Sequence, residues 1–189
     1  MFKKFPLLLM VAVLALPLAA HADEYADTVQ LFKNAGDSAK FFDKSYGYAV
    51  FPTIGKGGLG VGGAHGTGRV YVGGKYVGDT TMNQLSFGLQ AGGQAFSQIM
   101  FFEDKRAFDD FAGGNFELDA QASAVAIKAS ASAGAGSTGA RTSTSTSKSG
   151  TETQAPGYRK GMAVFYSIKG GAMYEAAVAG QKFKYKPNK

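Results

Sequence analysis

The chain has 189 residues, a formal net charge of +6 at pH 7 and no cysteine. Without cysteine, disulfides, thiolate metal sites and cysteine nucleophiles are excluded, so the fold must be held by packing alone. The length suits one domain with a single hydrophobic core, and the modest basic excess favours an anionic membrane surface or envelope polymer over nucleic acid as a partner.

The first 22 residues have the pattern of a secretory signal peptide. Two lysines precede an apolar run (7–18), and Ala20-His21-Ala22 places small residues where signal peptidase cleaves. We expect cleavage after Ala22, which lowers the net charge to +4 because Lys3 and Lys4 are lost. The product is expected to be an exported protein of the periplasm or cell envelope, with a single domain over 23–189.

Two segments have helical periodicity. Apolar residues recur at helical spacing over 24–44, where "NAGDS" (34–38) interrupts the pattern. We predict two short amphipathic helices here, whose apolar faces cover a sheet or, in part of the first helix, contact lipid. Helical spacing returns in "EDKRAFDDFAGG" (103–114), which predicts a short central helix.

The remaining segments have the period of two that is typical of strands. "YAVFP" predicts a short strand that ends at Pro52, Gly73-Gly74 predicts a hairpin turn, and Gly170-Gly171 predicts a turn between two late strands. Further strands are expected in "LSFGLQAGGQAFSQIMFF" and "FELDAQASAVAIKASASA". Residues 133–156 are low in complexity and predict a long exposed loop or extended hairpin tip.

These elements predict an α+β fold. We expect a strongly curved antiparallel sheet, or a small barrel-like β-core, of roughly six to eight strands. The two short N-terminal helices and the short central helix are expected to pack on it.

A glycine run, "GKGGLGVGGAHGTG" (55–68), contains the G-x-G-x-x-G pattern of dinucleotide-binding loops. Such loops require a helix directly after them, whereas a β-branched and aromatic segment follows here, so a nucleotide site is disfavoured. The glycines at even positions instead share one face of an extended strand. A face without side chains permits a sharp bend or the close approach of another element, which we expect to be an N-terminal helix.

The sequence contains no clear catalytic or metal-binding motif. His65 is the only histidine after residue 22, so a multi-histidine metal site cannot form. No G-x-S-x-G nucleophile elbow accompanies it. We therefore expect no enzymatic activity, no metal and no cofactor.

The basic residues are more suggestive. Lys56 and Arg69 flank the glycine run, Lys169 lies at a predicted turn, and lysines alternate with aromatic residues near the C-terminus (182–186). Alternation places Lys182, Lys184 and Lys186 on one face of a strand. Such a row suits anionic headgroups, and it equally suits the protection of an exposed strand edge.

Four segments, in order, resemble the SYLF domain family. They are "AVFPTIGKGGLGVGGAHGTG" (49–68), "LSFGLQAGGQAFSQIMFFEDKRAFDDF" (85–111), "FELDAQASAVA" (116–126) and "VFYSIKGGAMYEAAVAGQKFKY" (164–185), so the resemblance covers about 25–187. In eukaryotic members of this family, basic residues and an N-terminal amphipathic segment bind phosphoinositides, and some members bind actin. The resemblance implies lipid binding; actin is not expected to be a partner of an exported protein.

We therefore expect a non-catalytic module that binds anionic phospholipid headgroups. The candidate headgroup contacts are Lys56, Arg69, Lys169, Lys182 and Lys184, and the candidate acyl-chain contacts are Phe32 and Phe41. The alternative is a structural outer-membrane β-barrel or another non-catalytic envelope protein, because glycine and aromatic residues with period two also fit that class.

Overall fold

The computed structural model describes residues 23–114, 116–118, 124–127, 157–171 and 180–189. These contain three helices, α1 (Glu24–Asn34), α2 (Gly36–Phe42) and α3 (Lys105–Ala112), and six strands: β1 (Gly47–Val72), β2 (Lys75–Phe102), β3 (Phe116–Glu117), β4 (Ala124–Ala126), β5 (Met162–Gly171) and β6 (Lys182–Pro187). The expected signal peptide and low-complexity loop lie outside the described residues.

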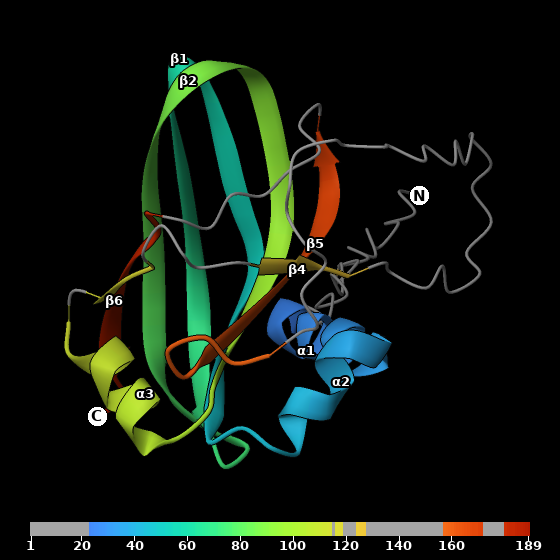
Figure 1. The fold of residues 1–189 in the computed structure, drawn as a ribbon, viewed down its shortest axis with the longest axis vertical. Coiled ribbons are helices and arrows are strands. Elements are labelled where there is room, and N and C mark those ends of the chain that lie inside the picture. The colour runs from blue at the N-terminus through green and yellow to red at the C-terminus, as the bar shows by residue number, and fades with distance from the viewer. Residues whose placement is uncertain (1–22, 115, 119–123, 128–156, 172–179) are drawn as a thin grey trace, which may run out of the picture.

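The fold is α+β, with a strongly curled, mostly antiparallel sheet that forms a half-barrel (Figure 1). This confirms the predicted fold class, and both predicted N-terminal helices and the central helix are present.

The sheet is built on one long hairpin. β1 has 26 residues and β2 has 28, and they pair in antiparallel register from Gly47↔Phe102 to Val72↔Lys75. Gly73 and Gly74 form the turn with φ values of 56° and 78°, the left-handed conformation that glycine adopts without a steric penalty. The two-stranded ribbon bends back on itself about midway along its length. We call this bend the crest (residues 58–63 of β1 and residues 85–92 of β2, which pair with them; Figure 1).

The other strands extend both halves of the ribbon. The first half of β2 pairs with β6 through residues 78–83, and the second half pairs with β5 through residues 94–102. β3 pairs with β6, and β4 pairs in parallel with β5. A single strand, β2, therefore contributes to both walls of the half-barrel.

The glycine face of β1 is confirmed, but its covering element is not a helix. Even-numbered residues from Gly62 to Val70 are buried. A Cβ added to Gly66 would lie 2.7 Å from Cγ1 of Ile54, and one added to Gly68 would lie 2.7 Å from Cδ1 of Phe51. The first half of β1 thus covers its own second half, and the expectation that an N-terminal helix covers these two glycines is wrong.

Two strand boundaries also differ from the sequence-based expectation. β1 continues past Pro52, because a register shift between Phe51 and Ile54 accommodates the proline, which lacks an N–H donor. Gly170 pairs with Ala95 inside β5, so it does not form the predicted turn. In both places tertiary pairing overrides a local breaker.

Hydrophobic clusters lie on both sides of the sheet. The inner cluster fills the half-barrel, where α3 closes the lower end and Phe111 lies 4.9 Å from Phe102 between ring centroids. The outer cluster lies under α1 and α2, where Phe41 contacts Phe165 with ring centroids 5.0 Å apart. Among the described residues, no helix has both the length and the apolar composition needed to cross a bilayer.

Candidate functional site

Lys56 lies inside the half-barrel rather than on its surface. Its side chain is 6% exposed, and its register partner on β2 is Gln94, which is 5% exposed. Register partners in an antiparallel pair point to the same face, so both side chains enter the interior just below the crest.

Arg69 connects β1 to the start of α1. Its Nη1 lies 3.2 Å from Oδ2 of Asp23, and its guanidinium carbon lies 4.1 Å from the ring centroid of Tyr25. Asp23 also caps α1, because its Oδ1 accepts a hydrogen bond from the backbone N–H of Tyr25. The guanidinium of Arg69 is therefore already engaged by an ion pair and a cation–π contact within the fold.

The other candidate lysines are exposed but do not form one cluster. Lys182 and Lys184 lie on the outer face of β6, opposite Asn83 and Thr81 of β2, and Lys182 forms an exposed ion pair with Glu117 at 3.5 Å. Lys169 lies on the other wall, where its Nζ donates to Oγ1 of Thr53 at 2.9 Å.

Phe32 and Phe41 lie in the outer hydrophobic cluster, where they are 0% and 8% exposed. Both rings anchor the N-terminal helices to the sheet, so neither is at the surface for contact with an acyl chain in this conformation. The helical periodicity that suggested a lipid-facing stripe is explained by packing on the sheet.

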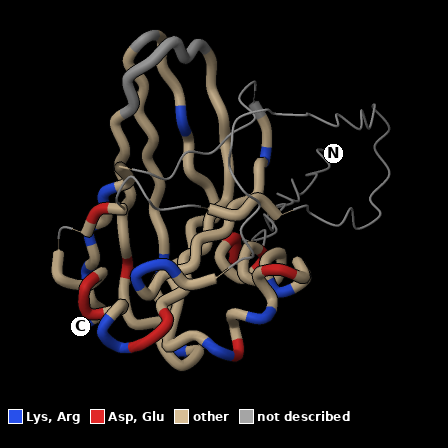
Figure 2. Tube along the Cα trace, viewed as in Figure 1, with Lys and Arg blue, Asp and Glu red and all other residues tan. Residues whose placement is uncertain are grey.

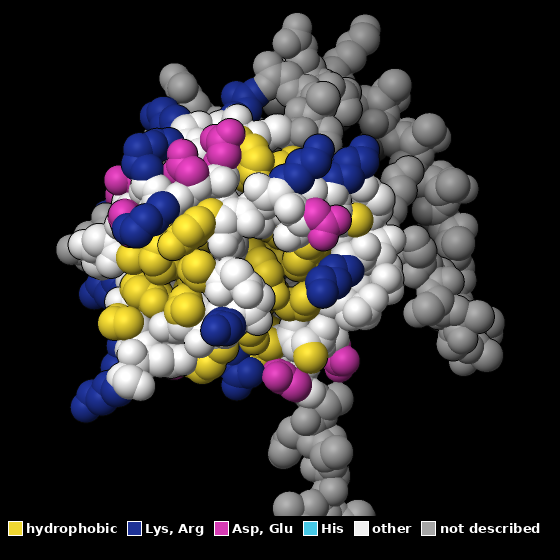
Figure 3. Space-filling model, turned by 90° about the horizontal axis from the view of Figure 1, so that it is seen from below, with side chains coloured by type: hydrophobic (Ala, Val, Ile, Leu, Met, Phe, Trp, Pro, Cys, Tyr) yellow, Lys and Arg dark blue, Asp and Glu magenta, His cyan; other side chains and the backbone are white. Residues whose placement is uncertain are grey.

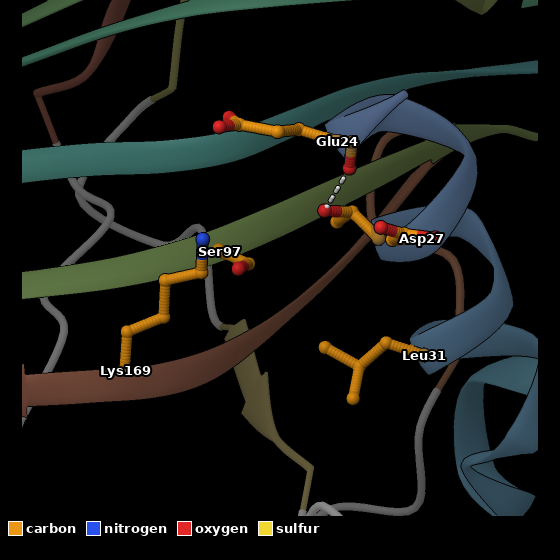
Figure 4. A pocket seen from close by; sticks show the side chains of 6 residues that line it. Glu24, Asp27, Leu31, Ser97 and Lys169 are labelled. Carbon is orange, nitrogen blue, oxygen red and sulfur yellow. Dashed lines mark hydrogen bonds between the residues drawn. The ribbon is translucent and has the colours of Figure 1, made fainter. Parts of the chain in front are cut away.

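A pocket of about 310 Å³ lies between α1 and the sheet (Figure 4). Glu24 and Asp27 of α1 border it on one side, and Lys169 of β5 and Ser97 of β2 border it on the other. Oγ of Ser97 already donates to the carbonyl of Pro52 at 2.7 Å. Two carboxylates beside one ammonium make this pocket unsuitable for an anionic headgroup.

The crest presents three exposed apolar side chains that were not singled out from the sequence. Leu59 is 81% exposed, Leu85 is 74% exposed and Val61 is 59% exposed. The signal was present in the glycine run: because its even positions face inward, large residues at odd positions must face outward.

The charge distribution differs between the crest and the opposite end of the molecule. Neither 51–68 nor 80–102 contains an aspartate or glutamate. Figure 2 shows the acidic residues in the lower part of the molecule, away from the crest. At the lower end, a space-filling view shows apolar side chains interleaved with both basic and acidic ones (Figure 3).

His65 lies on the outer face of β1, where its Nδ1 is 2.8 Å from Oδ1 of Asn83 on β2. Both side chains are exposed, and Asn83 lies two residues from Leu85 along β2. His65 is thus a cross-strand partner on a polar surface.

Residues 83–188 match the model of the family described as Ysc84, Las17-binding protein actin regulator. The chain belongs to this family, whose domain is also called SYLF. The match confirms the resemblance to the SYLF family over residues 83–188, which include the last three of the four segments; the first segment (49–68) lies outside the matched residues. The SYLF family is associated with lipid binding and is in general a non-catalytic binding domain. No curated protein matches the chain.

Proposed function

We propose that this SYLF protein is an exported module that associates with anionic phospholipid surfaces through its crest. Family membership supports lipid as the class of ligand. The observation that carries the proposal is the crest itself: three large apolar side chains are exposed there, and the adjoining segments 51–68 and 80–102 contain no acidic residue.

Exposure of this kind is unfavourable in water and favourable at a membrane. Leu59, Val61 and Leu85 are the most exposed large apolar residues described, and the register of β1 and β2 places all three at the crest. Burying a leucine or valine side chain contributes about 1.5–3 kcal/mol when it is complete. Partial insertion of three such side chains is sufficient for reversible membrane association.

The exposed lysines of β6 lie at a suitable depth below the crest. Lys182 is opposite Asn83, two residues from Leu85, and Lys184 is opposite Thr81, four residues from it. At about 3.4 Å per residue, the backbone positions of Lys182 and Lys184 are about 7 and 14 Å from that of Leu85, measured along the strand. The headgroup layer is about 5–8 Å thick on each side of a bilayer, so the long lysine side chains can reach its phosphates.

The opposite end of the molecule is a weaker candidate. Its apolar surface is interrupted by acidic side chains (Figure 3), which an anionic surface repels. The crest has no such carboxylate in its strand segments, so its charge is compatible with anionic lipid.

The same proposal excludes two other roles. A protein exported as its first 22 residues suggest would not meet actin, so the actin regulation in the family description is not extended to this chain. The proposal also requires no catalytic step: the ligand is bound at a surface and is not transformed.

Vesicle co-sedimentation tests the proposal. The protein is mixed with phosphatidylglycerol vesicles or with phosphatidylcholine vesicles, at low and at high salt. We expect binding to the anionic vesicles that weakens as salt rises, because the lysines contribute about 1 kcal/mol each near an anionic surface. The triple substitution Leu59→Ser, Val61→Ser, Leu85→Ser is expected to reduce binding by more than about tenfold.

Matched controls are available beside the Gly73-Gly74 hairpin turn, at the end of the molecule opposite the crest. Lys75 and Tyr76 are both exposed there, so Lys75→Gln and Tyr76→Ser should leave binding unchanged, whereas Lys182→Gln with Lys184→Gln should weaken it. Binding that is indifferent to both salt and the crest substitutions would show that the proposal is wrong.

A further inference from the structure

The pocket between α1 and the sheet is lined by charges of both signs. Its volume of about 310 Å³ is at the small end of the range for ligand pockets, about 300–1,000 Å³. Glu24 and Asp27 come from the first turn of α1, and Lys169 comes from β5 on the other side (Figure 4). A small cavity thus separates two carboxylates from one ammonium.

These three charged groups have no ionic partner in the described part of the chain. None of them takes part in any of its ion pairs. The ammonium of Lys169 donates one hydrogen bond, to Oγ1 of Thr53 at 2.9 Å, and so retains two of its three donors. The adjacent Asp23, by contrast, is held by Arg69 at 3.2 Å. The pocket therefore holds opposite charges apart without pairing them.

The two carboxylates suit an organic ammonium group. Glu24 and Asp27 are three residues apart on α1, so they share one face of the helix, and like charges at this spacing repel each other. An ammonium between them removes the repulsion, and its three N–H donors are enough for both. A metal ion requires a larger set of oxygen ligands, and the described residues contain no acidic or histidine cluster that could hold one.

The other lining residues provide contacts for the uncharged part of a ligand. Leu31 points from α1 toward the sheet and supplies an apolar surface (Figure 4). Ser97 of β2 is fully buried, and its Oγ donates to the carbonyl of Pro52 at 2.7 Å. A hydroxyl oxygen that donates one hydrogen bond still accepts others. The pocket thus adds one apolar contact and one acceptor to its charged groups.

We propose that this pocket binds a free α-amino acid with an apolar side chain. The ammonium of the amino acid lies between Glu24 and Asp27, and its carboxylate accepts hydrogen bonds from the ammonium of Lys169. Its side chain packs on Leu31. A zwitterion neutralises both sides of the pocket at once, whereas a simple anion or a simple cation leaves one side unpaired.

The position of the pocket indicates a soluble ligand rather than a lipid headgroup. Ser97 is five residues beyond Gly92, which pairs with Gly58 at the crest. At about 3.4 Å per residue, the pocket is about 17 Å from the crest along the strand. The headgroup layer is about 5–8 Å thick, so the pocket stays in water when the crest contacts a membrane. The site is therefore independent of the proposed membrane association.

Calorimetric titration with leucine tests the site. Two analogues separate the charges of leucine: isoamylamine lacks the carboxylate, and isocaproate lacks the ammonium. We expect leucine to bind and each analogue to bind about tenfold more weakly or less, because each loses a hydrogen-bonded charge. The titrations need no vesicles, so they do not depend on the crest.

Three variants each remove one charge from the pocket: Glu24→Gln, Asp27→Asn and Lys169→Met. Each is expected to weaken leucine binding about tenfold or more. Asp37→Asn, in the first turn of α2, and Lys75→Met, beside the hairpin turn, are the matched controls and should bind leucine as the unaltered protein does. All five side chains are exposed, so the variants should fold, which their melting temperatures check.

No binding of leucine up to millimolar concentration overturns the site, as does equal binding by the unaltered protein and all three pocket variants. Isoamylamine that binds as tightly as leucine shows that the carboxylate makes no contact and overturns the amino-acid assignment. The crest variant with serine at residues 59, 61 and 85 should bind leucine normally. Failure of vesicle binding and failure of leucine binding are thus separate results.

Discussion

At the scale of single residues, Gly66 and Gly68 allow β1 to cross over its own first half. Ile54 and Phe51 occupy the space where their side chains would be. The role of glycine here is close approach, because neither residue has a positive φ. The inner faces of the two halves can then meet without a gap in the core.

Replacing Gly68 with alanine should destabilise the protein by about 1–3 kcal/mol, the usual cost of overpacking a core. Its new Cβ would lie 2.7 Å from Cδ1 and from Cε1 of Phe51 and 2.8 Å from the carbonyl oxygen of Val50. Gly55→Ala is the control, because nothing lies within 4 Å of a Cβ at that position. Urea unfolding measures both, and equal midpoints for the two variants would contradict the packing argument.

Tyr48 should make stability sensitive to high pH. Burial, with a smaller contribution from the neighbouring Tyr71, raises the pKa of Tyr48 to about 12. The unfolded chain loses this proton near pH 10 and the folded chain near pH 12, so the free energy of unfolding falls as pH rises through that window. Tyr48→Phe should flatten the fall; urea midpoints between pH 9 and 12 test this, and an unchanged slope in the variant would refute it.

At the scale of elements, α1 is held at both ends, by β1 at its first turn and by α2 at its last. Arg69 holds its first turn through Asp23 and Tyr25. At the other end, Oγ of Ser38 donates to the carbonyl of Phe32 at 2.6 Å and so joins α2 to α1 across the break between them. Phe32 and Phe41 fill the interface below, which explains why this amphipathic segment lies on the protein.

Arg69→Met should therefore act on stability and not on membrane binding. Its exposed ion pair contributes about 0–1 kcal/mol and its stacking on Tyr25 about 0.5–1 kcal/mol, so we expect a loss of about 1 kcal/mol in urea unfolding. Vesicle binding should be unchanged, as it should be for the control Lys75→Met at the hairpin turn. A large loss of vesicle binding with unaltered stability would return Arg69 to the headgroup contacts.

At the scale of the whole molecule, the two ends of the half-barrel have different surfaces. The crest presents the exposed Leu59, Val61 and Leu85, and the segments 51–68 and 80–102 that lead to it contain no acidic residue, while the end with the helices and the hairpin turn carries both signs of charge (Figures 1 and 2). The curled sheet separates these ends by about half the length of the ribbon, because the ribbon bends midway at the crest. A membrane at the crest thus leaves the helices in water.

This orientation can be measured because the chain contains no tryptophan. A single tryptophan introduced as Leu85→Trp should shift its emission to the blue on anionic vesicles, since it enters the bilayer interface. The same residue introduced as Tyr76→Trp, near the hairpin turn, should show no shift. A shift at Tyr76 and none at Leu85 would reverse the orientation.

Much of the architecture could be predicted from local patterns. The helices, the Gly73-Gly74 turn and the two-residue period follow from propensity and periodicity, which neighbouring residues alone establish. The full lengths of β1 and β5 could not be predicted in this way, because Pro52 and Gly170 are local strand breakers that cross-strand pairing overrides. Of the candidate contacts, the lysines at 182 and 184 were placed on an exposed face by alternation, as the structure has them.

Residue type and spacing were enough to predict the α+β class, the family and the separation of inner and outer faces along β1. Which inward-facing residues meet depends on how the strands fold over one another, and it could be read only from the folded chain. Lys56 was expected among the headgroup contacts because of its charge, yet the half-barrel encloses it. The bend at the crest turns Leu59 and Val61 outward at the end of the molecule. Whether a side chain is buried depends on which strand segments lie opposite one another, and no single segment of the sequence contains that information.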